Sequence, residues 1–274
     1  MRLTVVVVTC NERDDVVRCI DSLFTHPAAG GQQVVIVDNG STDGTVEALT
    51  ERAPDAEIVT NQRNRGLTVA RNQGLRRAAG EYVAMLDSDT SVRAGTLETL
   101  CRYLDEHLEI GLVGPKLVFP DGSLQYSCRS FPTPMALVAN RLTSVPGLAE
   151  LPARRRYLML DEVHDREMAV DYVLGAAMVF RREAVAAIGE FDEHFGFSTP
   201  GGYGFDDADW ALRFHRAGWG VAYVPAAVAE HRYRRRLAKR PFARQNLALA
   251  ASYVRLRLKH RGAAWRPAST RPAA

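Results

Sequence analysis

The fold of this chain follows from one stretch, Tyr82-Val-Ala-Met-Leu-Asp87-Ser88-Asp89-Thr90, in which an apolar run ends abruptly in two carboxylates. Residues two apart on a strand point to the same face, so Asp87 and Asp89 are expected side by side at the end of a strand. Two such carboxylates can hold a divalent cation, because hard cations prefer oxygen ligands. The alternative is a polar loop that caps the following helix. The rest of the sequence is therefore needed to choose between a cation site and a helix cap.

Strand-like and helix-like patterns alternate on the N-terminal side of this stretch. Apolar, β-branched runs at 3–9 and 34–38 and a shorter run at 57–61 predict strands, and the segments between them have helical periodicity. The last of these helices, at about 67–79, carries its apolar residues on one face. Such alternation is typical of an α/β fold with a mostly parallel, doubly wound, Rossmann-like sheet over the first ~110 residues.

Polar residues follow three of these strands. They are Asn11 and Glu12 after the first strand, Asp38 and Asn39 after the second, and Asp87, Ser88 and Asp89 after the fourth. Ligands of open α/β sheets bind at the carboxyl ends of the strands, so these residues are expected to converge on one site. The dinucleotide motif G-x-G-x-x-G and the P-loop motif are both absent. The sheet is therefore expected to bind a nucleotide by another device.

The pattern changes after a helix expected at about 94–107. Strands are expected at 111–119, 169–180 and 218–224, and proline-rich loops at 128–168. Gly175 interrupts the middle strand, and its missing side chain permits close approach by a ligand or by another backbone. The run Asp206-Asp207-Ala208-Asp209-Trp210 opens a helix, where carboxylates favour the positive helix start and need no catalytic role.

The composition is that of an ordinary globular protein. The 274 residues are 46% hydrophobic and 24% charged, and they contain no run of 18 apolar residues that could span a bilayer. Residues 3–9 follow Met1-Arg2 as in a signal peptide, but no small-residue cleavage site follows, which favours a strand. The four cysteines lack C-x-x-C spacing, which is typical of reduced thiols in a cytoplasmic protein.

Charge is distributed unevenly along the chain. The 22 Lys and Arg of residues 1–231 stand against 32 acidic residues, whereas residues 232–274 hold 13 Lys and Arg and no acidic residue. A basic helix is expected at about 242–260, with Leu247, Ala250, Val254 and Leu258 as its apolar stripe, and disorder from Trp265 onward. A basic tail on an acidic body indicates a polyanionic neighbour, either an anionic membrane surface or nucleic acid.

Five motifs stand in a fixed order along residues 3 to about 232. They are Val-Val-Thr9-Cys-Asn11-Glu12; Val-Asp38-Asn39-Gly-Ser-Thr-Asp-Gly; Asn64-Arg65-Gly66 with Ala70-Arg71-Asn72; Leu-Asp87-Ser-Asp89; and Val170-Asp171-Tyr-Val-Leu-Gly175-Ala with Phe-Asp206-Asp207-Ala-Asp209. In this order they resemble the family 2 glycosyltransferases of the GT-A fold. The segments 114–116 and 127–134 further resemble the rhamnosyltransferase-like branch of that family.

The resemblance implies a set of residues that bind the nucleotide-diphosphate sugar. The set is Thr9, Asn11, Glu12, Asp38, Asn39, Arg65, Gly66, Arg71, Asp87 and Ser88. Within it, Asp38 would accept the N3–H of a pyrimidine base, which favours a UDP- or dTDP-linked donor such as dTDP-rhamnose. Arg71, assisted by Arg65, would reach the diphosphate.

The resemblance also implies a metal site and a catalytic base. Asp89 and Asp87 would hold Mg²⁺ or Mn²⁺ across the diphosphate. His231 matches a family histidine that completes the metal site, although a lone histidine near a strand end is often structural. Asp207 would take the proton of the acceptor hydroxyl in an inverting transfer. Family members usually have Glu-Asp where this chain has Asp206-Asp207.

Acceptor or sugar binding falls to four residues: Gly175, Asp206, Asp209 and Trp210. For Asp206 and Asp209 the alternative is a helix cap, and for Trp210 it is a place in the core. The loop at 196–204 is longer than the short aromatic segment expected at that place in the family, so the acceptor contacts there are left open.

The resemblance divides the chain into functional parts. Residues 1–110 would be the nucleotide-sugar-binding half and 111–231 the acceptor-binding and catalytic half of one GT-A domain, and the acceptor side would add a mixed or antiparallel portion to the sheet. The basic helix and tail at 232–274 would follow. The acceptor would be a glycan, a lipid-linked glycan or a small molecule. The enzyme would be cytoplasmic, with peripheral docking of the tail on the inner face of the membrane as a further expectation.

Two other functions stay open from the sequence. A sugar-nucleotide nucleotidyltransferase has a similar sheet, but usually carries a Gly-rich, Arg/Lys-bearing loop where this chain has Cys10-Asn-Glu-Arg13. A non-catalytic module that binds lipid or nucleic acid through the basic tail is the second. No nucleic-acid partner is expected, because no recognised nucleic-acid motif accompanies the tail.

Overall fold

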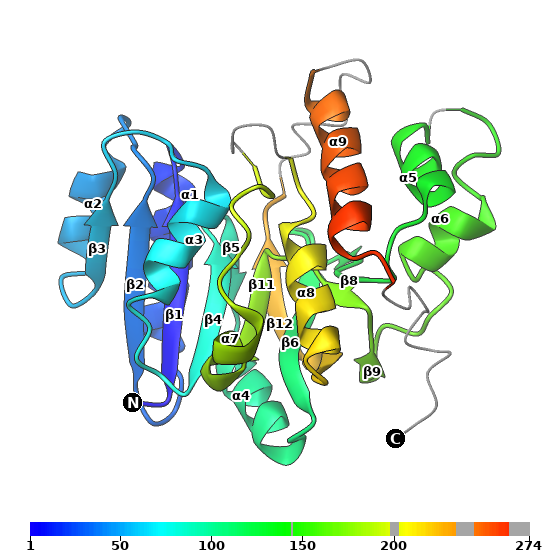
Figure 1. Ribbon diagram of the computed structural model, residues 1–274. Helices are drawn as coiled ribbons and strands as arrows, with labels where there is room; N and C mark the ends of the chain where they lie inside the picture. The colour runs from blue at the N-terminus through cyan, green and yellow to red at the C-terminus, as the bar shows by residue number, and fades with distance from the viewer. Residues whose placement is uncertain (144, 198–202, 234–243, 263–274) are drawn as a thin grey trace.

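A single large sheet organises the computed structural model, which describes residues 1–143, 145–197, 203–233 and 244–262 (Figure 1). Its strand order is β3-β2-β1-β4-β11-β6-β12-β5, with β7 beside β6 and β9 beside β12. The strands are β1 (Leu3–Thr9), β2 (Gln32–Asp38), β3 (Glu57–Thr60), β4 (Tyr82–Asp87), β5 (Thr90–Val92), β6 (Ile110–Val118), β7 (Leu124–Gln125), β9 (Met168–Ala169), β11 (Ala177–Arg181) and β12 (Gly220–His231). A separate pair joins β8 (Cys128–Arg129) to β10 (Tyr172–Val173).

The N-terminal part of the sheet is parallel, as the alternating pattern predicts. Strands β3, β2, β1 and β4 pair in parallel, with Thr9 opposite Asp38 and Asp38 opposite Thr60. All seven residues of β1 are buried, which is the burial of a strand covered on both faces. The register brings the carboxyl ends of these strands to one edge of the sheet, where the polar loops begin.

Helices cover both faces of the sheet (Figure 1). They are α1 (Arg13–Thr25), α2 (Thr45–Arg52), α3 (Leu67–Leu75), α4 (Thr96–Glu106), α5 (Pro134–Arg141), α6 (Pro152–Tyr157), α7 (Arg182–Ile188), α8 (Asp206–Arg216) and α9 (Arg244–Lys259). One core cluster joins α1, α2 and α4 to the face that carries Val5 and Val7. The other joins α3, α7, α8 and α9 to the face that carries Val6. The alternation of one β-branched run thus supplies both cores.

The C-terminal part of the sheet is mixed, as expected. Strand β11 lies antiparallel between β4 and β6, β6 and β12 are parallel, and β12 runs antiparallel to β5. Two details differ from the sequence prediction. A short strand, β5, separates the Asp87-Ser88-Asp89 turn from α4. The strand expected at 169–180 is three strands, because the chain leaves the main sheet after β9 to pair with β8 and returns at β11.

The prediction of loops at 128–168 is wrong in part. Two of the prolines there begin helices. Pro134 opens α5, which Thr133 caps by accepting a hydrogen bond from the backbone N–H of Ala136, and Pro152 opens α6. Proline suits the first turn of a helix, because its ring fixes a helical φ and its missing N–H has no partner to lose there.

The basic helix at the C-terminus is confirmed, and the structure shows which way its apolar stripe faces. The exposed fractions of Leu247, Val254 and Leu258 are 76%, 54% and 49%, so the expected apolar stripe faces outward. Tyr253 and Leu256 are buried instead. The physical reason is a set of polar contacts that hold the other face of α9 against the protein, as described below. The basic run before α9 and the residues from Trp265 onward lie outside the described part of the chain.

Close packing of α3 on β1 depends on Gly74. A Cβ atom at this position would lie 2.2 Å from Cγ1 of Val6. Overpacking of this kind costs about 1–3 kcal/mol. We therefore expect Gly74→Ala to lower the free energy of unfolding by about that amount, as measured by urea denaturation, although alanine is the better helix former.

The double variant Val6→Ala/Gly74→Ala provides the control. Removing the methyl groups of Val6 frees the space that the new Cβ needs, so the loss in the double variant should be smaller than the sum of the two single losses. Additive losses would contradict the steric explanation.

Candidate active site

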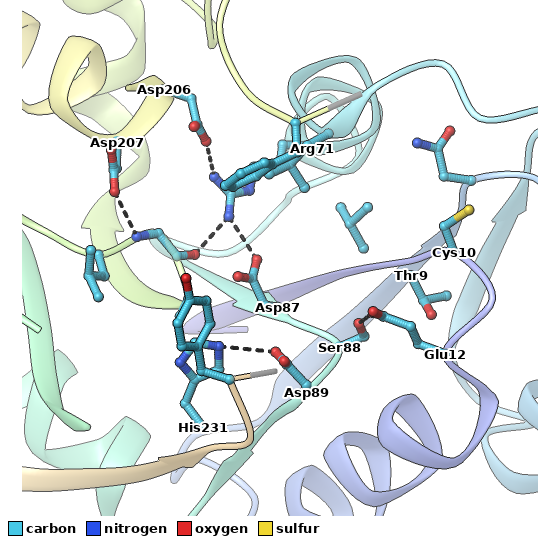
Figure 2. Close-up of a pocket in the computed structure, with 18 of the residues that line it drawn as sticks. Thr9, Cys10, Glu12, Arg71, Asp87, Ser88, Asp89, Asp206, Asp207 and His231 are labelled. Carbon is cyan, nitrogen blue, oxygen red and sulfur yellow. Dashed lines mark hydrogen bonds and ion pairs between the residues drawn. The ribbon is translucent and has the colours of Figure 1, made fainter. Parts of the chain in front are cut away.

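A cavity of about 810 Å³ opens at the carboxyl ends of β1, β2 and β4. Its wall is completed by the start of α8, the end of β12 and the chain between β10 and β11, so both parts of the sheet contribute (Figure 2). Of the predicted site residues, those that line it are Thr9, Asn11, Glu12, Asn39, Arg71, Asp87, Ser88, Asp89, Gly175, Asp206, Asp207 and His231. Seven segments that are distant in sequence thus meet at this cavity, and the three polar loops converge there as predicted.

The loops after β1 and β2 are joined by hydrogen bonds at one end of the cavity. Oδ1 of Asn11 accepts a hydrogen bond from the backbone N–H of Thr42 (2.8 Å), and the backbone N–H of Asn11 donates to Oγ of Ser41 (2.8 Å). Asn11 adopts a positive φ of 54°, a conformation that asparagine tolerates better than most residues. The two loops therefore form one rigid wall.

Asn39 connects this wall to the start of α3. Its side chain donates to Oδ1 of Asn64 and to the carbonyl of Gly66, and accepts from the backbone N–H of Arg65. The side chain of Arg65 is exposed and, like Gly66, is not part of the cavity wall. Arg65 and Gly66 thus support the wall from outside it, because their backbone groups hold the side chain of Asn39.

Asp38 lies just behind the same wall. Its Oδ2 accepts hydrogen bonds from the backbone N–H groups of Gly40 and Ser41. Its Oδ1 and the hydroxyl of Thr9 are buried, and neither has a hydrogen-bond partner among the described residues. A buried acceptor without a donor is costly, so a donor from a ligand would be stabilising here.

Arg71 is the centre of the cavity wall between the two halves of the sheet. Its guanidinium donates to Oδ2 of Asp206 (2.6 Å), to Oδ1 of Asp87 (2.9 Å) and to the carbonyl of Gly175 (2.7 Å). A Cβ atom on Gly175 would lie 2.9 Å from Nη1 of Arg71, so this arrangement requires a glycine. The close approach predicted for Gly175 is therefore made by an arginine side chain, and Arg71 binds two carboxylates.

Three potential metal ligands meet beside this arginine. One ligand atom each from Asp87, Asp89 and His231 lies within 4.8 Å of the others, and Nε2 of His231 lies 3.2 Å from Oδ1 of Asp89 (Figure 2). Strand β4 ends at Asp87, so the two carboxylates do not share a strand face as predicted. A turn brings Asp89 back, and the pairing of β5 with β12 sets Thr90 opposite His231.

Gln125 orients the imidazole of His231. Nδ1 of His231 lies 2.9 Å from Oε1 of Gln125, a contact that keeps the proton on Nδ1 and turns Nε2 toward Asp89. Burial by itself would lower the pKa of His231, but the hydrogen bond and the charge of Asp89 outweigh burial and raise it. Two carboxylates and one imidazole are a suitable ligand set for Mg²⁺ or Mn²⁺. The residues thus fit the predicted metal.

The first turn of α8 carries three carboxylates that point in different directions. Asp206 binds Arg71, and Asp207 faces the cavity, where the backbone N–H of Gly175 donates to its Oδ2 (3.4 Å). Burial, followed by the charge of Asp206, raises the pKa of Asp207 from 3.8 to about 7. A carboxylate with a pKa near neutrality is suited to accept a proton from an alcohol.

The predicted binding roles of Asp209 and Trp210 are wrong. Asp209 is buried on the far side of α8, where it binds Arg213, Lys259 and His260 and so holds α9. Trp210 is fully buried and stacks on Phe191, with ring centroids 3.8 Å apart. The helix places consecutive side chains about 100° apart, so the turn that presents Asp207 to the cavity directs the next residues into the core.

Several residues of the cavity wall received no site role in the sequence analysis. They are Cys10, Asn64, Leu67, Gln125, Arg129, Leu174, Phe197, Tyr203 and Tyr233. Gln125 and Arg129 lie within or beside the stretches that resemble the rhamnosyltransferase-like branch, which is the one signal that pointed there. The loop expected to contact the acceptor is described only at its ends, because 198–202 lie outside the described residues.

A family model described as glycosyl transferase family 2 matches residues 4–189, about two thirds of the chain. The chain belongs to glycosyl transferase family 2. It is a glycosyltransferase, and family membership sets aside the nucleotidyltransferase and the non-catalytic module that the sequence left open. The match covers the first four of the five sequence motifs and the start of the fifth.

Two curated relatives of this glycosyltransferase are proteins of Mycobacterium tuberculosis. It is 27% identical over 242 residues to an N-acetylglucosaminyl-diphospho-decaprenol L-rhamnosyltransferase of Mycobacterium tuberculosis, covering 84% of this chain and 76% of the relative. It is 29% identical to a pre-mycofactocin glycosyltransferase of the same organism, covering 86% of this chain but only 43% of the relative. The resemblance to the rhamnosyltransferase-like branch is thus confirmed.

Solved structures confirm the GT-A fold of this glycosyltransferase. The mannosyltransferase PcManGT of Pyrobaculum calidifontis, in complex with GDP-Man and Mn²⁺, superposes with a TM-score of 0.59 at 24% identity. GalNAc-T7, with UDP, GalNAc and Mn²⁺, superposes with a TM-score of 0.66 at 17% identity. The chain covers 58% and 48% of these two proteins, and they cover 86% and 94% of it.

The raised pKa of Asp207 gives a pH prediction. If this carboxylate is the base, activity requires its ionised form, so kcat/KM should rise with pH through a midpoint near 7. Asp207→Asn should lower kcat by about 100-fold or more at pH 8. The measurement is a pH profile of initial rates with the two proteins.

The stability of the same variant separates catalysis from folding. A raised carboxylate pKa means that ionisation disfavours the folded state, a cost absent below pH 3.8 and fully present above about pH 7. Asp207→Asn should therefore be at least as stable as the wild type at pH 8 in urea denaturation. Asp55→Asn, at an exposed position outside the site, is the control and should change neither kcat nor the free energy of unfolding. A variant that is inactive because it is unfolded would contradict the assignment.

Proposed function

We propose that this glycosyltransferase moves a sugar, with inversion, from a pyrimidine-diphosphate sugar to a hydroxyl of a saccharide carried on a lipid diphosphate. The observation that carries the proposal is one cavity lined by both the Asp87, Asp89 and His231 cluster and by Asp207. A metal site and a base in one cavity suit a reaction in which one oxygen leaves as a diphosphate while another attacks.

The donor half of the proposal rests on the loops after β1 and β2. The unpartnered Oδ1 of Asp38 is suited to accept the N3–H of uracil or thymine, which a purine lacks in that position. The relative named as an L-rhamnosyltransferase favours a dTDP-linked 6-deoxysugar as the first donor to test. GDP-mannose belongs in the same test, because PcManGT is described with GDP-Man.

The catalytic half rests on the residues around Arg71. Asp207 would accept the proton of the acceptor hydroxyl as that oxygen attacks the anomeric carbon from the side opposite the diphosphate. Mg²⁺ or Mn²⁺ bound by Asp87, Asp89 and His231 would offset the charge that grows on the leaving diphosphate. Arg71 would act as a positioning residue, because its hydrogen bonds hold Asp87 and Asp206 on either side of it. Direct contact of Arg71 or Arg65 with the diphosphate stays a prediction.

Calorimetric titration tests the donor and the metal together. We expect UDP or dTDP to bind more tightly in the presence of Mn²⁺, and Asp89→Ala to remove the Mn²⁺-dependent gain. A tenfold loss corresponds to about 1.4 kcal/mol. Asp55→Ala, which replaces an exposed carboxylate far from the cavity wall, should bind as the wild type does.

Two outcomes would contradict the donor proposal. Equal affinity for the nucleotides with and without Mn²⁺ would remove the metal from the mechanism. Tighter binding of GDP than of UDP and dTDP would replace the pyrimidine donor by a purine donor.

An anionic membrane surface is the proposed location of the acceptor. The outward face of α9 carries Leu247, Val254 and Leu258, whose spacing places them along one line of the helix. Tyr203, which lines the cavity, donates its backbone N–H to Oγ of Ser252 on the inner face of α9. Residues 232–274 carry 13 Lys and Arg and no acidic residue. An apolar stripe within a basic segment is the pattern of a helix that lies in a lipid interface. Among the described residues, no helix is long and apolar enough to cross a membrane.

Vesicle co-sedimentation tests this location. We expect the protein to bind phosphatidylglycerol vesicles and to leave phosphatidylcholine vesicles free, with binding that weakens as salt is raised. Replacing Leu247, Val254 and Leu258 together by serine should lower the partition coefficient by about tenfold or more. Leu108→Ser, at an exposed leucine on another surface, is the matched control. Unchanged binding of the triple variant, or a dimer that the triple variant dissociates, would contradict the proposal.

A further inference from the structure

Arg129 is a cation of the cavity wall that no motif assigned. It lies on β8 opposite Tyr172 of β10, and its half-buried side chain lines the cavity. Nη1 donates to the carbonyl of Cys128 (2.8 Å), and the guanidinium lies 6.0 Å from the centroid of the Tyr157 ring. These contacts fix the side chain but leave most of the five N–H groups of the guanidinium for another partner.

The other cationic groups of this wall are already paired with carboxylates. Arg71 binds Asp87 and Asp206, and His231 contacts Asp89. Within the described part of the chain, Arg129 forms no ion pair. A guanidinium in a cavity rich in carboxylates, yet paired with none of them, is suited to an anionic group of a ligand.

Arg129 stands on the side of the cavity where the base lies. The backbone N–H of Leu174 donates to the carbonyl of Ser127 (2.8 Å), which fixes the adjacent Gly175 beside β8, and Gly175 in turn donates to Asp207. Tyr157 and Tyr172 share a hydrogen bond between their hydroxyls (3.0 Å). Burial first, with the charge of Asp207 among the further causes, raises the pKa of both tyrosines. Arg129, its two tyrosines and Asp207 therefore form one local environment.

We propose that Arg129 binds a phosphate group of the acceptor, next to the sugar whose hydroxyl Asp207 deprotonates. The inference rests on the proposed function and deepens it, because it gives the acceptor a negative charge close to its reacting sugar. A phosphate in this place faces Asp206 and Asp207 across the cavity, so it needs a cation that those carboxylates have not neutralised. A planar guanidinium meets two phosphate oxygens at once, which an ammonium does not.

The test compares one lipid-linked sugar that carries a diphosphate with one that carries none. One is N-acetylglucosamine linked through a diphosphate to a short prenyl chain, and the other is the octyl glycoside of the same sugar. We expect the wild type to bind the diphosphate probe at least tenfold more tightly in calorimetry. Arg129→Gln, which removes the charge and keeps an amide donor on a shorter side chain, should remove that preference and leave binding of the octyl glycoside and of the nucleotides unchanged. Arg129→Lys should restore only part of it.

The outcomes distinguish this inference from the proposed function. A wild type with no preference for the diphosphate probe, or a preference that Arg129→Gln retains, would overturn the inference even if the enzyme transfers sugar. Loss of nucleotide affinity in Arg129→Gln would also overturn it, by assigning Arg129 to the diphosphate of the donor. A preference that depends on Arg129 supports the inference, even where no sugar is transferred and the proposed function fails.

Discussion

The buried guanidinium of Arg71 is the interaction on which the site depends. It joins Asp206, Asp87 and the carbonyl of Gly175, which lie on α8, on β4 and on the chain before β11. A buried charge with one partner removed costs about 3–5 kcal/mol, so these three segments are strongly coupled. The coupling fixes the distance between the candidate metal ligands and the proposed base, although they come from opposite halves of the sheet. The geometry of the proposed site is thus maintained by buried ion pairs.

The first turn of α8 distributes three adjacent acidic residues among three tasks. Asp206 holds Arg71, Asp207 faces the cavity, and Asp209 binds α9. Asp207 and Asp209 have different pKa values because they have different neighbours. Burial and the charge of Asp206 raise the pKa of Asp207. Burial would also raise the pKa of Asp209, but the hydrogen bond to His260 and the charges of Arg213 and Lys259 lower it. One short sequence therefore supplies two carboxylates whose pKa values are shifted in opposite directions.

The sequence predicted what depends on periodicity and order, and missed what depends on long-range packing. The parallel sheet and its polar edge followed from β-branched runs and the loops behind them. The contact of Arg71 with Asp206 joins residues 135 positions apart, and no local pattern encodes it. Leu247, Val254 and Leu258 have the spacing of a buried stripe, yet the polar anchor at Asp209 turns them outward. Pro134 and Pro152 suggested loops because proline interrupts helices, but each stands in the first turn of a helix, where proline is tolerated. Gln125 lies only beside a stretch of weak resemblance, since its role arises once β7 and β12 both pair with β6.

The anchoring of α9 has a consequence for where this polypeptide can be shortened. Nε2 of His260 and Nζ of Lys259 lie 2.8 Å and 2.7 Å from Oδ1 of Asp209, which is almost fully buried. A chain that ended before α9 would lose both groups, together with the buried contacts of Tyr253 and Leu256. It would leave a carboxylate partly unpaired in the helix turn that also presents Asp207. The last helix is therefore an integral part of the folded domain. A shortened chain should end after residue 260 and not before residue 244.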